Sequence, residues 1–533
     1  MDEPTDVHPV DQVPPLSRLA PLGLQHVLAM YAGAVAVPLV VGGALISAGR
    51  LSPGDLPFLI SADLFVAGIA SIIQSIGFWR FGVRLPMMQG CTFAAVGPMI
   101  AIGTEYGVTA IYASVIISGL FMILVAAVFS QLLRFFPPLV TGTIILIIGV
   151  SLTAVAAGWV GGGSASASYG SPGNVGLAFF TLVVILVIER FAPPFLQRLS
   201  ILLGLVVGTL VAIPFGYADF SGAAQESWFG FPTPFHFGLP DFSLGLLAAY
   251  FSMIVVALVI MTETTGDMLA IGEIVDKPLS RRQLADGIRA DGLSTMIGGV
   301  FNTFPYTAFA QNVGLVSLSG VRSRFVATFA GGVLIILGLI PKLGGVVEGI
   351  PQAVLGGAGI ALFGMVAASG VRTLAKVQFN NANILVVAIS LAVGLLPTVA
   401  VTSGQGEALH VFGQLPESLQ IVVNSGISAG AITAIILNLV FNSRAVQRRH
   451  GTEDEGYAAF DAVRSAATDV TMPVPDTGPP WTATRSTPRA GRRSSAGLRP
   501  SAAAARWPGS RDGRPRPGPP PRRPAGARAS WPG

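Results

Sequence analysis

The stretch that decides the fold is Asn302-Thr303-Phe304-Pro305-Tyr306-Thr307-Ala308-Phe309-Ala310-Gln311-Asn312-Val313-Gly314, which lies inside an apolar part of the chain. Pro305 has no backbone N–H to donate, and the aromatic and β-branched residues around it favour an extended backbone. Because lipid cannot satisfy a polar backbone, an extended segment at membrane depth must be buried in protein or line a cavity. Together with the amides of Gln311 and Asn312, the stretch predicts a binding site inside a membrane protein.

The composition is typical of a polytopic membrane protein. Of 533 residues, 52% are hydrophobic and 11% are charged. Apolar runs of roughly 17–25 residues recur, each long enough to cross a ~30 Å hydrocarbon core. The one cysteine, Cys91, excludes a disulfide framework and a cysteine metal site. The net charge of +5 reflects an Arg-rich C-terminal tail more than a surface for nucleic acid.

Hydropathy and turn signals predict an all-α membrane protein with about fourteen transmembrane segments, of which segments 3, 9 and 10 are short and interrupted by Gly or Pro. The segments are expected near residues 23–47, 55–77, 87–103, 107–130, 137–157, 173–190, 199–215, 241–271, 288–301, 306–318, 323–341, 350–370, 381–400 and 419–441. The first is too long for a signal peptide, so we expect it to remain in the mature protein.

Basic residues lie almost entirely in the even-numbered connections, since the odd-numbered ones hold only Arg50 and Lys342. By the positive-inside rule, both termini are cytoplasmic. We therefore expect a cytoplasmic N-terminal segment (1–20), a transporter domain (21–445) and a cytoplasmic tail (446–533). The tail is rich in Pro, Arg and Ala and cannot build a core, so we expect it to be disordered.

A weak internal repeat relates the two halves of the transporter domain. Residues 136–142 at the start of segment 5 resemble residues 350–356 at the start of segment 12, and residues 118–121 resemble 330–333. Matched segments seven apart face opposite sides of the membrane, which is typical of a 7+7 inverted repeat. Segments 3 and 10 are also seven apart, and transporters of this kind build their site where such broken segments meet.

Ionisable side chains inside spans are expensive, so each one is a functional hypothesis. Glu263 and Asp267 are spaced i,i+4 in segment 8, which stacks both carboxylates on one helix face. Two neighbouring carboxylates in a low dielectric cannot both ionise cheaply, an arrangement that suits a proton-coupled carrier. The alternative is a helix end that reaches cytoplasmic water.

Three other ionisable residues carry weaker signals. His26 is the only histidine expected in a span, and it is either a proton carrier or a structural hydrogen-bonding group. Asp291 heads segment 9 as either a functional acid or an N-cap. Asp63 is expected near the outer interface, without a role.

Segment 3 carries Gly90, which permits close backbone approach, and Phe93, which offers a flat face. Paired with the extended part of segment 10, this piece would satisfy the partner's backbone and point free N–H and C=O groups at a ligand.

At this point the sequence resembles the nucleobase–ascorbate transporter family of nucleobase/cation symporters, which includes bacterial uracil, xanthine and uric acid permeases. The resemblance covers about residues 20–445 and is most specific at Gln311-Asn312-Val313-Gly314 through Ser319, Gly320, Ser323 and Arg324, with support from Gln25-His26 and Glu263…Asp267. It implies fourteen spans in a 7+7 inverted repeat, with short strands in segments 3 and 10. Segments 1–4 and 8–11 would form a core domain, and segments 5–7 and 12–14 a gate domain.

The resemblance also implies roles for residues. Glu263 would accept hydrogen bonds from the substrate ring, Gln311 would make a two-point amide contact, Phe93 would stack on the ring, and Val313–Gly314 would complete the pocket. The supporting or proton-coupling residues are His26, Asp267, Asp291 and Asn312.

Gln311 and Asp267, where uracil permeases have Glu and His, point to oxidised purines. Ala94, where xanthine permeases often have Asn, leaves xanthine versus uric acid open.

We therefore expect a proton-coupled importer of xanthine or uric acid in the cytoplasmic membrane, working by alternating access. The expected partners are the nucleobase, the lipid bilayer and a second copy bound through the gate domain, with no cofactor other than the coupling ion and no metal site. A uracil-selective symporter and an anion exchanger of the same fold are the alternatives. An enzyme is excluded, because no nucleophile–base set, metal cluster or nucleotide loop is present.

Overall fold

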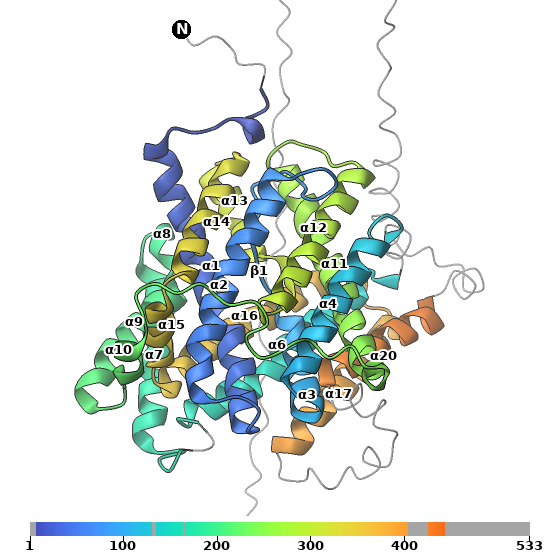
Figure 1. Ribbon diagram of the computed structural model, residues 1–533. Coiled ribbons are helices and arrows are strands. Elements are labelled where there is room, and N and C mark those ends of the chain that lie inside the picture. The colour runs from blue at the N-terminus through green and yellow to red at the C-terminus, as the bar shows by residue number, and fades with distance from the viewer. Residues whose placement is uncertain (1–6, 130–134, 164–165, 403–424, 443–533) are drawn as a thin grey trace, which may run out of the picture. The chain divides into compact units, whose positions relative to one another are not determined.

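The computed structural model describes residues 7–129, 135–163, 166–402 and 425–442, and its regular structure is mainly helical (Figure 1). The tail predicted at 446–533 lies outside the described residues. The helices are α1 (Leu16–Ser47), α2 (Leu56–Ile76), α3 (Val96–Tyr106), α4 (Val108–Val125), α6 (Pro138–Val160), α7 (Pro172–Phe191), α8 (Pro194–Gln197), α9 (Ser200–Ala212), α10 (Ser221–Gln225), α11 (Leu247–Ile274), α12 (Arg281–Val300), α13 (Ala310–Ser319), α14 (Arg324–Gly338), α15 (Pro341–Glu348), α16 (Gln352–Leu374), α17 (Asn381–Thr402) and α20 (Gly426–Asn442).

Seven helices among the described residues are long and apolar enough to cross a membrane by length and composition. An eighth candidate is the pair α14 and α15, which bends by 77°. Segments of α9, α17 and α20 are apolar but shorter. The chain is thus a multi-pass helical membrane protein, as its hydropathy predicted.

Two short antiparallel strands interrupt the helices, and they confirm the strands expected in segments 3 and 10. Strand β1 (Gln89–Cys91) pairs with β2 (Tyr306–Ala308), with Gly90 opposite Thr307. The pairing is extended at each end, because Thr92 N donates to Pro305 O and Phe309 N donates to Met88 O, both at 3.0 Å. Each strand satisfies the other's backbone inside the apolar interior, and each leads into a short helix, α3 or α13.

Close helix pairs hold this strand pair in place, and glycine makes them possible. Helix α2 packs against α14, and α4 packs against α12. A Cβ on Gly68 would lie 2.5 Å from Gly331 O, and one on Gly331 would lie 2.7 Å from Gly68 O. Gly119 and Gly292 are related in the same way, at 2.5 and 2.6 Å. Each contact brings the two backbones nearer than any side chain would allow.

One end of the molecule is fastened by the N-terminal segment. Asp11 pairs with Lys277 in the α11–α12 connection (3.2 Å) and with Arg324 at the start of α14 (2.7 Å). Arg324 also donates to the carbonyls of Ser75 and Ile76, which end α2. Burial raises the pKa of Asp11, but its hydrogen bonds and proximity to Lys277 and Arg324 outweigh that effect and hold the pKa below its ordinary value.

Candidate functional site

The strand pair is tethered to three helices by hydroxyl groups. The backbone N of Gln89 donates to Ser71 Oγ of α2 at 2.9 Å. In the second strand, the backbone N of Tyr306 donates to Thr295 Oγ1 of α12 at 3.1 Å, and that of Ala308 donates to Thr264 Oγ1 of α11 at 3.2 Å. These short side chains fix the strands without filling the space beside them.

Helix α11 brings its two acids to this place, as the i,i+4 spacing predicted. Glu263 and Asp267 are both half-buried, and Glu263 directly precedes the tethering residue Thr264. Asp291 of α12 is fully buried, and its Oδ1 accepts a hydrogen bond of 2.8 Å from Gln74 Nε2 of α2. Asp267 lies within electrostatic range of both Glu263 and Asp291. Three carboxyl groups from two helices therefore gather beside β2.

His26 lies in α1 and is buried against α13. Asn312 Nδ2 lies 3.0 Å from His26 Nδ1 and donates to the backbone oxygen of His26 at 3.1 Å. The carbonyl contact requires the amide nitrogen on that side, so Nδ1 accepts the other hydrogen bond and carries no proton. Through these contacts His26 links α1 to α13, and its expected supporting or proton-coupling role stays a prediction.

The residues expected to touch substrate lie in or just before the two short helices that follow the strands, α13 and α3. Gln311 is exposed in the first turn of α13, followed by half-buried Val313 and exposed Gly314. Phe93 is half-buried at the start of the turn Phe93–Ala95 before α3, and its ring meets Phe363 of α16 edge-on at 6.0 Å. No hydrogen bond between Gln311 and Glu263 occurs in the part of the chain that the structure describes.

The sequence analysis missed two candidate functional residues, Asp63 and Gln89. Asp63, to which the sequence assigned no role, has a side chain that is 1% exposed, and Tyr306 Oη donates to Asp63 Oδ1 at 2.7 Å; its position near the outer interface stays a prediction. Gln89 is fully buried and lies within reach of Asp291. An acid in the middle of an apolar run was the available signal for Asp63.

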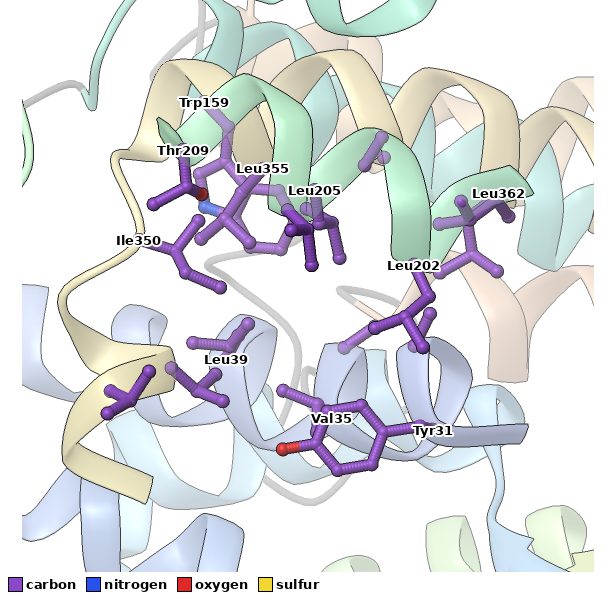
Figure 2. Close-up of a pocket in the computed structure, with 18 of the residues that line it drawn as sticks. Tyr31, Val35, Leu39, Trp159, Leu202, Leu205, Thr209, Ile350, Leu355 and Leu362 are labelled. Carbon is purple, nitrogen blue, oxygen red and sulfur yellow. The ribbon is translucent and has the colours of Figure 1, made fainter. Parts of the chain in front are cut away.

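A separate cavity of about 320 Å³ lies between α1, α9 and α16 (Figure 2). The residues that line the cavity include no charged residue, and those labelled in the figure include Tyr31, Trp159, Leu202, Leu205 and Leu362. Among the lining residues only Tyr31, Trp159 and Thr209 carry polar side-chain atoms, so a heterocycle with several donors and acceptors would find few partners there. The strand pair, with three carboxyls beside it, is the more polar of the two places.

Broken helices that meet at a polar site inside the membrane are the construction of a secondary transporter. A model described as the permease family matches residues 17–402. The chain is 45% identical to the nucleobase transporter PlUacP of Paenibacillus larvae, over 84% of this chain and 99% of that protein. It is 43% identical to the xanthine permease of Bacillus subtilis (79% and 93% covered) and to the uric acid transporter UacT of Escherichia coli (83% and 89% covered). The chain therefore belongs to the xanthine/uracil permease family, as its motifs indicated, and is a transporter, not an enzyme.

Two solved structures are similar to this chain in fold, at much lower sequence identity. The transmembrane domain of the cyanobacterial bicarbonate transporter BicA is 17% identical, with a TM-score of 0.52 over 81% of this chain and 100% of that one. SLC26A9 is 13% identical, with a TM-score of 0.50 over 81% of this chain and 67% of that one. At these identities the likeness concerns the fold alone.

Proposed function

We propose that this protein takes up an oxidised purine, xanthine or uric acid, across the cytoplasmic membrane together with a proton. The observation that carries the proposal is the placement of Glu263 beside the strand pair, with Gln311 opening α13 and Phe93 preceding α3. A carboxylate, an amide and an aromatic face can read the donors, acceptors and flat surface of a purine. The names of the relatives, a xanthine permease and a uric acid transporter, support the same substrate class.

Proton coupling is assigned to the acidic group of Glu263, Asp267 and Asp291. Their separate positions on α11 and α12 bring three carboxyls into one low-dielectric region, with no ion pair to Lys or Arg among the described residues. Charging all three at once is unfavourable, so a proton bound there offsets charge. Uric acid is an anion at neutral pH, and a protonated partner removes its repulsion from Glu263.

The helices are further proposed to form fourteen segments in a 7+7 inverted repeat, with β1/α3 as segment 3 and β2/α13 as segment 10. In such a repeat, segment 2 (α2) corresponds to segment 9 (α12), and segment 11 (α14) corresponds to segment 4 (α4). The pair α2–α14 therefore corresponds to the pair α12–α4, and each pair is built on facing glycines. Helices α6 and α16, segments 5 and 12, pack extensively on each other, and both are preceded by a proline cap, Pro137 or Pro351.

Alternating access then follows from a core domain (segments 1–4 and 8–11) that moves against a gate domain (segments 5–7 and 12–14). Contacts across this boundary include the aromatic pair of Phe93 with Phe363 and a buried hydroxyl contact of 3.1 Å between Ser252 Oγ and Ser428 Oγ, which the movement must break or exchange. Both termini are assigned to the cytoplasm by the positive-inside rule. The exposed apolar faces of α7, α17 and α20 in the gate face lipid or a second copy of the chain.

The test is uptake of radiolabelled xanthine and urate by cells that express the full chain, with and without a protonophore. Glu263→Gln removes the acceptor and should reduce uptake at least tenfold, whereas Glu273→Gln, an exposed acid on the same helix, should leave it unchanged. Unchanged uptake by the Glu263 variant would sink the site assignment. Competition by uracil alone would favour the pyrimidine alternative, and protonophore-insensitive uptake would favour an exchanger.

A further inference from the structure

Strand β2 also contacts a buried acid of α2, in addition to the three carboxyls of α11 and α12. Asp63 projects from α2, and its Oδ1 accepts a hydrogen bond from Tyr306 Oη at 2.7 Å. The same hydroxyl also lies 3.1 Å from the backbone oxygen of Asp63 and 3.0 Å from Thr303 Oγ1. Asp63, Thr303 and Tyr306 are each at most 1% exposed. The tyrosine hydroxyl is thus the centre of a closed polar cluster.

No cation balances Asp63. None of the ion pairs among the described residues includes it, and the titratable groups beside it are the Tyr306 hydroxyl and the thiol of Cys91 in β1. An isolated carboxylate in such a place is very costly, whereas a neutral carboxyl that accepts one good hydrogen bond is not. The surroundings therefore suit Asp63 as an uncharged acceptor.

We infer that Asp63 is a positioning residue of the transport site, which holds strand β2 in place by accepting the hydrogen bond of Tyr306. This inference rests on the proposed function. Tyr306 lies five residues before Gln311, and the chain between them is tethered at the backbone of Tyr306 and Ala308. Phe309 packs against Gly90 so closely that a Cβ there would lie 2.2 Å from its ring. A shift of Tyr306 is therefore passed along the strand to the amide that faces the substrate.

The three helices that contact β2 hold different groups of the strand. Thr264 and Thr295 hold backbone N–H groups, and either would do so for any residue in the strand. Thr264 Oγ1 also lies 3.2 Å from the side-chain hydroxyl of Thr307, but only a residue with a hydroxyl at position 306 can donate to Asp63. The contact with Asp63 also ties β2 to α2, the helix that holds β1 through Ser71. Asp63 thereby makes the two strands one rigid unit.

The experiment measures xanthine and urate binding and uptake by four variants of the full-length protein. Tyr306→Phe and Asp63→Leu should each weaken binding about fivefold to tenfold, the size expected for one lost hydrogen bond. Asp63→Asn, which keeps the accepting oxygen without charge, should retain affinity and proton-driven accumulation. Ser61→Ala removes a buried hydroxyl of α2 that has no hydrogen-bond partner, and it serves as the matched control.

The double variant Asp63→Leu/Tyr306→Phe should bind no more weakly than the weaker single variant, because both remove the same contact. The inference also predicts that KM rises while the maximal rate stays within twofold. A loss of accumulation in Asp63→Asn with binding intact would overturn it, since Asp63 would then carry a proton. Wild-type affinity in both Asp63→Leu and Tyr306→Phe would overturn it as well. Failure of the wild type to bind either purine would instead count against the proposed function, and the ratio between variants is then measured with the nucleobase that does bind.

Discussion

Two neighbouring glycines in α14 give a test of the helix pairing that positions the strands. In Gly331→Ala, the new Cβ would lie 2.7 Å from Gly68 O and 2.8 Å from Ile72 Cγ1 of α2. A backbone carbonyl cannot rotate away, so the helices must separate by several tenths of an ångström. In Gly332→Ala, the new Cβ meets nothing within 4 Å. The two changes differ in this contact and not in chemistry.

The magnitude follows from that contrast. Both alanines gain the same helix propensity, about 1 kcal/mol relative to glycine. Only Gly331→Ala also overpacks an interface, which costs about 1–3 kcal/mol. We therefore expect Gly331→Ala to melt below Gly332→Ala, which should melt at or above the wild type.

The chain offers its own probe for this measurement. Cys91 is the single cysteine and is fully buried in β1, so a thiol-reactive fluorophore labels it only when the strand pair opens. Melting curves of the purified protein in detergent, followed by Cys91 labelling, compare the two variants directly. Equal melting temperatures for Gly331→Ala and Gly332→Ala would refute the close α2–α14 contact. The same result would remove the main support for the repeat relation between that pair and α4–α12.

Two further predictions concern Asp11, tested by melting curves, and the apolar cavity, tested by purine binding. Asp11→Asn should lower stability by no more than about 1 kcal/mol at pH 7, because its ion pairs to Lys277 and Arg324 are partly exposed. The pKa of Asp11 is lowered in the folded state, so this contribution is present above its unfolded pKa of about 4 and disappears as the pH falls through the folded pKa. The stabilities of wild type and variant should therefore converge in acid. A difference in stability that widens in acid would contradict the ion pairs. Ala358→Leu should fill part of the cavity beside Trp159 and leave purine affinity unchanged, and a large loss of affinity would show that the cavity, not the strand pair, holds the substrate.

Sequence patterns were sufficient for the elements of this fold that depend on local chemistry. Pro305 and the aromatic residues after it predicted an extended segment, and β2 begins at Tyr306. The i,i+4 spacing placed Glu263 and Asp267 together, because a helix has a fixed period. The match of Gly119 with Gly331 was legible too, although only the structure shows that each faces another glycine.

The sequence could not supply the direction in which each helix residue faces or its distant partners. Hydropathy locates an apolar run, but it gave no sign that Asp63 of α2 contacts Tyr306 of β2. The register of β1 and β2 joins residues more than two hundred positions apart, and no local pattern encodes such a pairing. The same limit applied to His26, whose contact with Asn312 joins two segments far apart in the sequence.

The acids around β2 suit the proposed combination of binding and coupling at one strand. Glu263 and Asp267 belong to α11 and are half-buried, so a proton and a substrate can reach them. Asp63 is buried and contacts a tyrosine, so the effect that we infer for it is mechanical. If all these acids titrated during transport, charge would accumulate around a strand pair to which the described residues supply no ion-paired cation, and the site would be destabilised at the moment of binding. Confining titration to the acids of α11 and α12 and keeping Asp63 as a neutral anchor avoids that conflict. Asp63→Asn is therefore expected to be tolerated where Glu263→Gln is not.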